Sequence, residues 1–114
     1  MPNPVVYFEI GGKHVSGLRQ FNKGAFDWDI TPVPTINYAT IAPCEPDGIG
    51  GRIGHTDGPG HVTFYIQADD LEATLERIQS LAGRIVMPPI EIPNVVGLAM
   101  FADPEGHIIG LVKS

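Results

Sequence analysis

The chain has 114 residues, a length that suits one domain with a single hydrophobic core. Hydrophobic residues make up 43% of the sequence and charged residues 18%, which favours a folded domain over a disordered chain. The 13 acidic residues outnumber the 7 basic ones, and the resulting net charge of −6 argues against binding to nucleic acid or to an anionic membrane, because both require clustered lysine and arginine.

The first half of the chain begins with a strand pattern, PVVYFEI at residues 4–10. Its alternation predicts two opposite sets of side chains. One set, expected to face a helix, is Val6, Phe8 and Ile10, and the other is Val5, Tyr7 and Glu9. A helix is expected over residues 14–28, with Leu18, Phe21, Ala25 and Trp28 as its apolar stripe. Two strands from about residues 30 and 36 follow, and then a glycine-rich strand at 47–53.

The second half begins with the cleanest alternation of the chain, HVTFYIQ at residues 61–67. Val62, Phe64 and Ile66 are expected to face a helix, and His61, Thr63, Tyr65 and Gln67 to face the other way. The helix itself is expected over residues 69–83. Asp69 is the predicted N-terminal cap, with Glu72 three residues later, and Gly83 is the predicted end. The stripe is Leu71, Leu75, Ile78 and Ala82.

Three strand candidates complete the second half, starting at Arg84, Gly97 and His107. Residues 88–97 are rich in proline, so we expect an edge or a loop there rather than a central strand. The sequence DPEG at 103–106 predicts a hairpin turn, because proline presets one backbone angle and Gly106 tolerates a positive φ.

The two halves repeat the same order of elements. Phe8 matches Phe64 at an offset of 64 − 8 = 56, and residues 47–53 match 105–111 at an offset of 105 − 47 = 58. We therefore predict an α+β fold in a single domain, 1–114. It would consist of two βαβββ modules, at about 3–54 and about 60–114, whose curved mixed sheets form a cleft with the helices outside.

Two such modules in this length resemble the glyoxalase, bleomycin-resistance and extradiol-dioxygenase superfamily, also called vicinal oxygen chelate proteins. The segments GHVTFYIQADDLEATLERIQSLAG and MFADPEGHIIGLV are most similar to it. In its metal-dependent members, the resemblance implies, a divalent metal is held by four strand positions. These map to Val5, Arg52, His61 and Gly110. Only His61 has a side chain that can ligate, so we expect no metal and no cofactor in this chain.

The resemblance places a ligand cleft on the polar faces of the first strands. Candidate catalytic residues are His61 and Glu9, and the candidate substrate-binding residues are Tyr7, Thr63, Tyr65 and Arg52. His61 could be a base, a lone metal ligand or a hydrogen-bond donor to substrate, or it could simply bond to a neighbouring residue. Arg52 could anchor a carboxylate or phosphate, or, after a one-residue slip, point into solvent. His107 is expected at the turn and not in the cleft.

Three functions remain open from the sequence. The chain could be a metal-free small-molecule binder or enzyme, a metal-dependent lyase, isomerase or dioxygenase of the glyoxalase type, or a protein that sequesters a cationic antibiotic. The expected partners are a small-molecule ligand and a second copy of the chain, in a homodimer whose interface includes residues 88–96. The single cysteine, Cys44, and a first segment without signal-peptide features predict a soluble, cytoplasmic protein.

Overall fold

The computed structural model describes residues 2–91 and 97–114 and contains two compact units. Tyr7–Thr63 form one unit, named the N unit here. Phe64–Ser114, together with the residues up to Val6, form the other, named the C unit. The elements follow the order strand, helix and three strands twice over, so the predicted pair of βαβββ modules in an α+β fold is confirmed.

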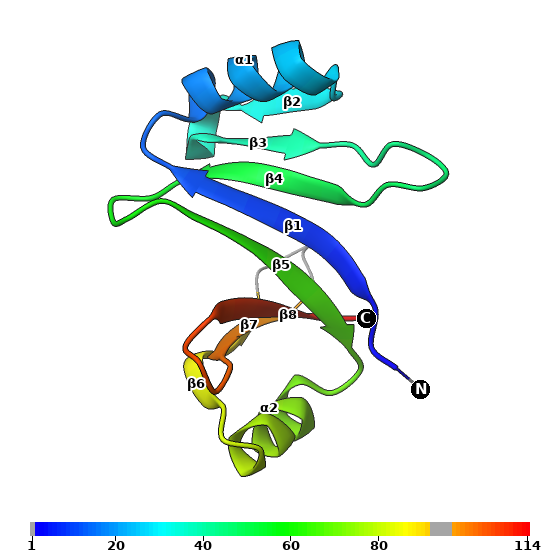
Figure 1. The fold of residues 1–114 in the computed structure, drawn as a ribbon, viewed down its shortest axis with the longest axis vertical. Coiled ribbons are helices and arrows are strands. Elements are labelled where there is room, and N and C mark those ends of the chain that lie inside the picture. The colour runs from blue at the N-terminus through cyan, green and yellow to red at the C-terminus, as the bar shows by residue number, and fades with distance from the viewer. Residues whose placement is uncertain (1, 92–96) are drawn as a thin grey trace. The chain divides into compact units, whose positions relative to one another are not determined.

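The N unit contains a mixed sheet covered on one face by a helix (Figure 1). Its elements are β1 (Val5–Gly12), α1 (Val15–Phe26), β2 (Ile30–Val33), a 3-10 helix (Pro34–Ile36), β3 (Tyr38–Ile41) and β4 (Gly50–His55). The strand order is β2-β3-β4-β1. The β1–β4 pair is parallel, and the β2–β3 and β3–β4 pairs are antiparallel.

The core of the N unit lies between α1 and one face of this sheet. Val15, Ile41 and Ile53 are buried there, and Phe8 and Ile10 of β1 pack against them, as their alternation predicts. The predicted helix stripe needs correction. Phe21 is 68% exposed and Ala25 is exposed, whereas Asn22 is buried.

The α1 stripe therefore keeps Leu18 but includes Val15 before it and Asn22 in place of Phe21. Asn22 can be buried because its side-chain Nδ2 donates to the Leu18 carbonyl oxygen at 2.9 Å, which satisfies the amide within the helix. A pattern search that counts only apolar residues places Phe21 on the buried face instead.

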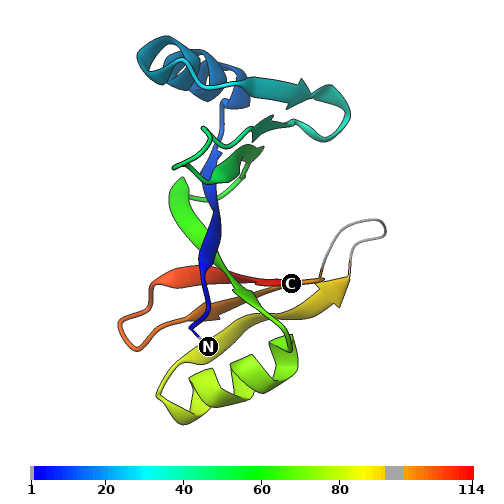
Figure 2. The ribbon, with the colours of Figure 1, turned by 90° about the vertical axis from the view of Figure 1, so that its right-hand side faces the viewer.

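The C unit has the same plan (Figure 2). Its elements are β5 (His61–Ala68), α2 (Leu71–Ser80), β6 (Arg84–Glu91), β7 (Gly97–Ala102) and β8 (Ile108–Lys113), with β5 shared between the two units. The strand order is β5-β8-β7-β6. The β5–β8 pair is parallel, and the other two pairs are antiparallel. In the described part of the chain, neither helix combines the length and apolarity that a membrane span would need.

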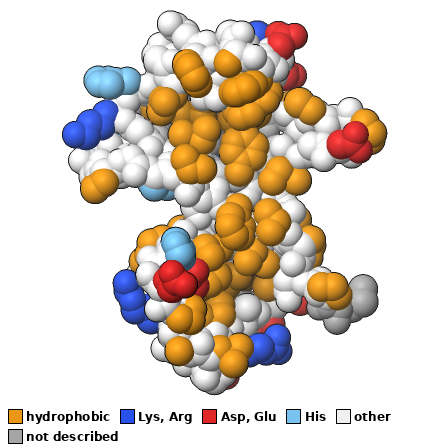
Figure 3. Space-filling model, viewed as in Figure 1, with side chains coloured by type: hydrophobic (Ala, Val, Ile, Leu, Met, Phe, Trp, Pro, Cys, Tyr) orange, Lys and Arg blue, Asp and Glu red, His pale blue; other side chains and the backbone are white. Residues whose placement is uncertain are grey.

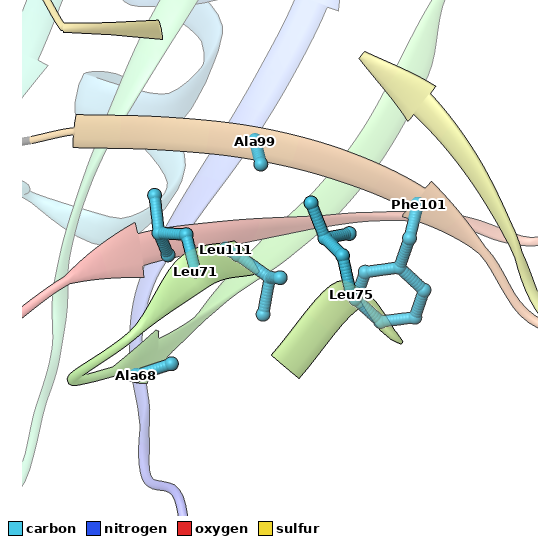
Figure 4. Packing of buried hydrophobic residues seen from close by; sticks show 6 residues of the cluster. All are labelled: Ala68, Leu71, Leu75, Ala99, Phe101 and Leu111. Atoms are coloured by element: carbon cyan, nitrogen blue, oxygen red, sulfur yellow. The ribbon is translucent and has the colours of Figure 1, made fainter. Parts of the chain in front are cut away.

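Leu71 and Leu75 of α2 pack on the strands of the C unit (Figure 4). The residues they meet are Ala68, Ala99, Phe101 and Leu111, with Ile66 at the margin of the cluster. The alternation of β5 is thus correct at Ile66. The predicted cover by the helix fails further toward the start of the strand, where Val62 is 75% exposed and Phe64 is 38% exposed.

Helix α2 is shorter than the predicted 69–83, and the residues that mark its two ends each differ from the prediction by one position. Asp70 caps the first turn, because its Oδ1 accepts from the Ala73 backbone N–H at 3.0 Å, whereas the predicted cap, Asp69, bonds to Ser114. At the other end, where Gly83 was the predicted stop, Ala82 adopts the left-handed conformation (φ 74°). Gly83 instead makes a close approach, since a Cβ there would lie 2.5 Å from Ile78 Cγ2 and 2.9 Å from the Ala102 carbonyl oxygen.

Strand β6 extends further than the prediction allowed. It continues through Pro88 and Pro89 to Glu91 and, among the described strands, pairs with β7 alone at the end of the strand order. The ladder shifts register between Met87 and Ile90, so the two prolines fall at an irregularity, where a missing N–H disturbs the sheet least. The rest of the predicted edge segment, residues 92–96, lies outside the described residues.

The hairpin between β7 and β8 confirms the predicted turn and the position of His107. Gly106 has φ +93°, and its N–H donates to the Asp103 carbonyl oxygen at 2.9 Å. The exposed His107 side chain lies beside the turn, with Nδ1 2.8 Å from Asp103 Oδ2. His107 therefore helps to order the turn.

Candidate functional site

The sheet face of the N unit opposite α1 carries polar side chains; we call it the polar face. Strand alternation places Tyr7 and Glu9 of β1 on it, because Phe8 and Ile10 point toward α1. Arg52 of β4 pairs directly with Glu9 in the sheet and lies on the same face. The alternative considered from the sequence, in which a one-residue slip of β4 turns Arg52 into solvent, is therefore not the register of the structure.

A nearly buried carboxylate lies at the centre of the polar face. The Glu9 side chain is 11% exposed. Arg52 donates to its Oε1 from Nη2 at 2.9 Å and from Nε at 3.2 Å. Two charge-assisted hydrogen bonds from one guanidinium stabilise the negative charge of Glu9 and fix the carboxylate in place.

His61, at the start of β5, holds the other oxygen of the same carboxylate. Its Nε2 lies 3.1 Å from Glu9 Oε2. Because an ionised carboxylate only accepts hydrogen bonds, this contact requires the proton on Nε2 and leaves the Nδ1 lone pair available in the neutral ring. Among the described residues, none hydrogen-bonds to Nδ1, and the side chain is 44% exposed.

A glycine makes room for this histidine. A Cβ built on Gly11 would lie 2.2 Å from His61 Cε1 and 2.7 Å from both ring nitrogens. The imidazole thus occupies the space that any other residue at position 11 would need. Gly11 therefore allows His61 to reach Glu9.

Two tyrosines flank the ion pair. Burial raises the pKa of Tyr7 above its ordinary value of 10.0; the positive charge of Arg52 opposes this effect, while Tyr38 and Glu9 add to it. Tyr38 of β3 places its ring centroid 5.7 Å from the guanidinium carbon of Arg52, within cation–π range. Both tyrosines therefore lie within electrostatic reach of Arg52.

The sequence predictions identified most of these residues but missed Tyr38. The segment YATI of β3 alternates, with Ala39 and Ile41 buried and Tyr38 on the opposite face. This alternation could have been read from the sequence, but four residues are too few to distinguish a strand from a loop. Gly11 carried no signal in the sequence, because only the contact with His61 shows its role.

The two remaining predicted residues lie in different units. Thr63 belongs to the N unit, two residues after His61 on β5, and is buried. Tyr65 belongs to the C unit and is also buried, with its ring against Gly110, where a Cβ would lie 2.3 Å from Tyr65 Cδ2. The structure thus brings Glu9 into direct contact with both Arg52 and His61, and the roles of all six predicted residues stay predictions.

The residues at the mapped metal positions do not fit a divalent metal ion. Val5 and Gly110 have no donor atom in their side chains, and Arg52 is a cation that already binds the carboxylate nearest to His61. In the described residues, no three His, Cys, Asp or Glu side chains lie close enough to share a metal ion. The donor set thus departs from that of the metal-dependent proteins.

Comparison with known proteins supports the resemblance inferred from the sequence. A family model described as the Glyoxalase/Bleomycin resistance protein/Dioxygenase superfamily matches residues 9–111. The chain is 25% identical, over 123 residues, to anthracycline biosynthesis protein DnrV of Streptomyces peucetius. That match covers 92% of this chain and 45% of the relative, so the chain spans about half the length of the curated relatives it matches.

Two solved structures share the fold. A glyoxalase/bleomycin resistance protein/dioxygenase superfamily member from Vibrio splendidus has a TM-score of 0.70 at 15% identity, with 99% of this chain and 100% of that chain covered. The Mn(II)-bound glyoxalase from Novosphingobium aromaticivorans also has a TM-score of 0.70, at 13% identity, with 98% and 40% covered. Because the family model spans nearly the whole chain, this protein belongs to the glyoxalase, bleomycin resistance protein and dioxygenase superfamily.

Proposed function

We propose that the polar face of the N unit binds a small organic molecule and that His61 removes a proton from it. The observation that carries this proposal is the Glu9 carboxylate, which is held by Arg52 on one oxygen and by His61 Nε2 on the other. The arrangement orients the imidazole and leaves Nδ1 as the basic atom, which is the geometry of a carboxylate-supported general base.

The substrate that suits such a base is a carbon acid, a compound with a C–H bond next to a carbonyl group. Proton removal would form a C=C bond to the carbonyl carbon, and the electron pair would move onto the carbonyl oxygen. The proton would reside on His61 Nδ1 and return to the same or another carbon. When the ring is protonated, the adjacent Glu9 stabilises the positive charge at a distance of 3.1 Å.

The remaining predicted residues of the N unit would bind and orient this molecule. The hydroxyl of Tyr7 suits a hydrogen bond to the carbonyl oxygen, and Thr63 lies on the same strand as His61. Arg52 would act mainly as a positioning residue, because its Nε and Nη2 are already used by Glu9. Tyr65 belongs to the C unit and has no part in this proposal.

The test is proton exchange measured by NMR in deuterated water. Purified protein is incubated with a panel of 2-oxoacids, thioesters and aromatic ketones, and loss of the signal of the proton next to the carbonyl is followed. We expect exchange that depends on His61 and is abolished in His61→Ala, with Glu9→Gln slower than wild type.

The matched control is His107→Ala. This histidine also contacts a carboxylate, Asp103, but it lies at a turn of the C unit. It should exchange protons at the wild-type rate. The proposal is wrong if wild type and His61→Ala exchange protons at equal rates. It is also wrong if wild type exchanges no proton of any compound in the panel.

We also propose that the protein acts as a homodimer through β6. This strand is last in the strand order of the C unit, and its Ile85, Val86 and Ile90 are 37%, 42% and 41% exposed. Figure 3 shows that hydrophobic side chains also lie at the surface elsewhere in both units. Light scattering at micromolar concentration should give twice the chain mass, and Val86→Lys should lower it. A wild-type monomer would reject the dimer.

A further inference from the structure

The polar face contains a position without a side chain beside the proposed base. Gly54 of β4 pairs with Gly11 of β1, over which the His61 ring lies. The two glycines differ in their surroundings: a Cβ on Gly11 would collide with His61, whereas a Cβ on Gly54 would have no atom within 4 Å. Gly54 therefore borders open space.

The neighbours of Gly54 give this space two sides. On the β3 side, Gly54 pairs with Tyr38, and on the β1 side it pairs with Gly11. Because neighbouring strands lie about 4.8 Å apart, the backbones of Tyr38 and Gly11 are separated by about 10 Å at this level. The open space over Gly54, called the slot here, is bordered by two strands: β3, whose Tyr38 side chain lies on the same face, and β1, where the His61 imidazole lies over Gly11. Arg52 lies two residues before Gly54 on the same face.

The backbone beneath the slot belongs to a strand that is paired on both sides. Strand β4 is paired on both sides, with β3 and with β1, so its backbone groups are used within the sheet. The one cation on this strand face, within the described residues, is Arg52, and Glu9 neutralises it at 2.9 Å. The slot thus offers two ring-bearing walls and no uncompensated charge, which is suited to an uncharged planar group.

We infer that Gly54 is the specificity-determining residue of the site, and that the substrates are planar conjugated or aromatic carbonyl compounds that lie on its backbone between Tyr38 and His61. This inference rests on the proposed function, because it places the planar group beside the proposed base. A Cβ at position 54 would meet no atom of the protein within 4 Å. We therefore expect a substitution at position 54 to change ligand binding and not the stability of the fold.

The experiment compares Gly54→Ala, Gly54→Val and Gly54→Leu by calorimetric titration and by the exchange assay. The planar probe is 2-acetonaphthone, and the branched, non-planar probe is 3,3-dimethyl-2-butanone. We expect wild type to bind the planar probe more tightly. Its affinity should fall stepwise with side-chain size, by about tenfold or more in Gly54→Leu, while binding of the branched probe changes less.

Two controls separate a blocked slot from a damaged fold. Gly24→Leu adds the same side chain on α1, where a Cβ would also have no atom within 4 Å, and it should bind the planar probe like wild type. The melting temperature of Gly54→Ala should stay the same or rise, because glycine within a strand is unfavourable. A fall in melting temperature would contradict the open space at Gly54 and overturn the inference.

The failures of the two proposals are distinguishable. If wild type exchanges protons through His61 but Gly54→Leu binds 2-acetonaphthone equally well, the inference about Gly54 is wrong and the proposed function stands. If His61→Ala exchanges protons as fast as wild type while Gly54→Leu no longer binds 2-acetonaphthone, the proposed role of His61 as a base is wrong and the inference about binding at Gly54 stands. A wild type that binds neither probe overturns the inference.

Discussion

The imidazole of His61 occupies the place of the side chain that Gly11 lacks. A Cβ at position 11 would lie 2.2 Å from His61 Cε1, far inside van der Waals contact. His61 therefore reaches Glu9 across the bare backbone of β1. This relationship between a glycine and a histidine 50 residues apart links a backbone property to the orientation of the proposed base.

We expect Gly11→Ala to displace His61 from Glu9. The added methyl group and the ring cannot share the same space, so the ring must rotate away and lose its contact with Glu9 Oε2. Long-range proton–nitrogen NMR of the imidazole should show protonation on Nε2 in wild type and a mixture of tautomers in Gly11→Ala. Gly54→Ala, its cross-strand neighbour, should retain the wild-type spectrum. An unchanged spectrum in Gly11→Ala would contradict the packing.

Arg52→Ala is expected to lower the free energy of unfolding by about 1–3 kcal/mol, because it leaves the nearly buried Glu9 carboxylate without its two charge-assisted hydrogen bonds. Arg52→Lys keeps the positive charge but loses the paired hydrogen bonds of the guanidinium, so the unfolding free energy should fall less than in Arg52→Ala. Urea denaturation at neutral pH measures both. Lys23→Ala, which removes the exposed Lys23–Asp27 pair, should show no measurable change. An equally small effect in Arg52→Ala would mean that the Glu9 pair contributes no stability.

The raised pKa of Tyr7 predicts a loss of stability at alkaline pH. Burial favours the neutral phenol in the folded state, so the folded pKa lies above the unfolded value of about 10. This contribution is present below pH 10 and is lost as the pH rises through the folded pKa. The unfolding free energy of wild type should therefore fall relative to that of Tyr7→Phe above pH 10. Parallel curves for the two proteins up to pH 11.5 would refute the shift.

The end of α2 predicts opposite effects for two adjacent substitutions. Ala82→Gly should raise the unfolding free energy by about 1 kcal/mol, because Ala82 has a positive φ of 74° that glycine adopts without strain. Gly83→Ala should lower it by about 1–3 kcal/mol, because the new Cβ would meet Ile78 and the Ala102 carbonyl oxygen. Thermal denaturation compares them. Destabilisation by Ala82→Gly would show that its backbone is not strained.

Much of the fold could be predicted because strand alternation and helix periodicity are local. The segment 61–67 and the repeat near Phe8 identified both modules, and the turn at Gly106 followed from its residue types. The errors occurred where specific hydrogen bonds and close packing override the hydropathy pattern. Asn22 is buried with a hydrogen bond to Leu18 that no hydropathy count detects. At the end of α2, Ala82 has the positive φ, and Gly83 makes the close approach to Ile78.

For the candidate site, alternation placed Glu9 and Tyr7 on the correct face of β1. It could not show which residues meet there. The contact between Glu9 and Arg52 depends on the register of β1 against β4, and that register is set by strands far apart in the sequence. Gly11 had no pattern of its own, since a glycine beside a glycine predicts only flexibility.

The parallel pairing of the first and last strands of each module has a consequence for the order of folding. Tyr7 pairs with Gly50, a separation of 50 − 7 = 43 residues, and Tyr65 pairs with Gly110, a separation of 110 − 65 = 45. The β7–β8 hairpin closes over only a few residues. Because long loops close late, we expect hairpins to form first and the parallel ladders last, so that a ribosome must release nearly a whole module before its sheet is complete. Pulsed hydrogen exchange during refolding should protect β7 and β8 before β1 and β4.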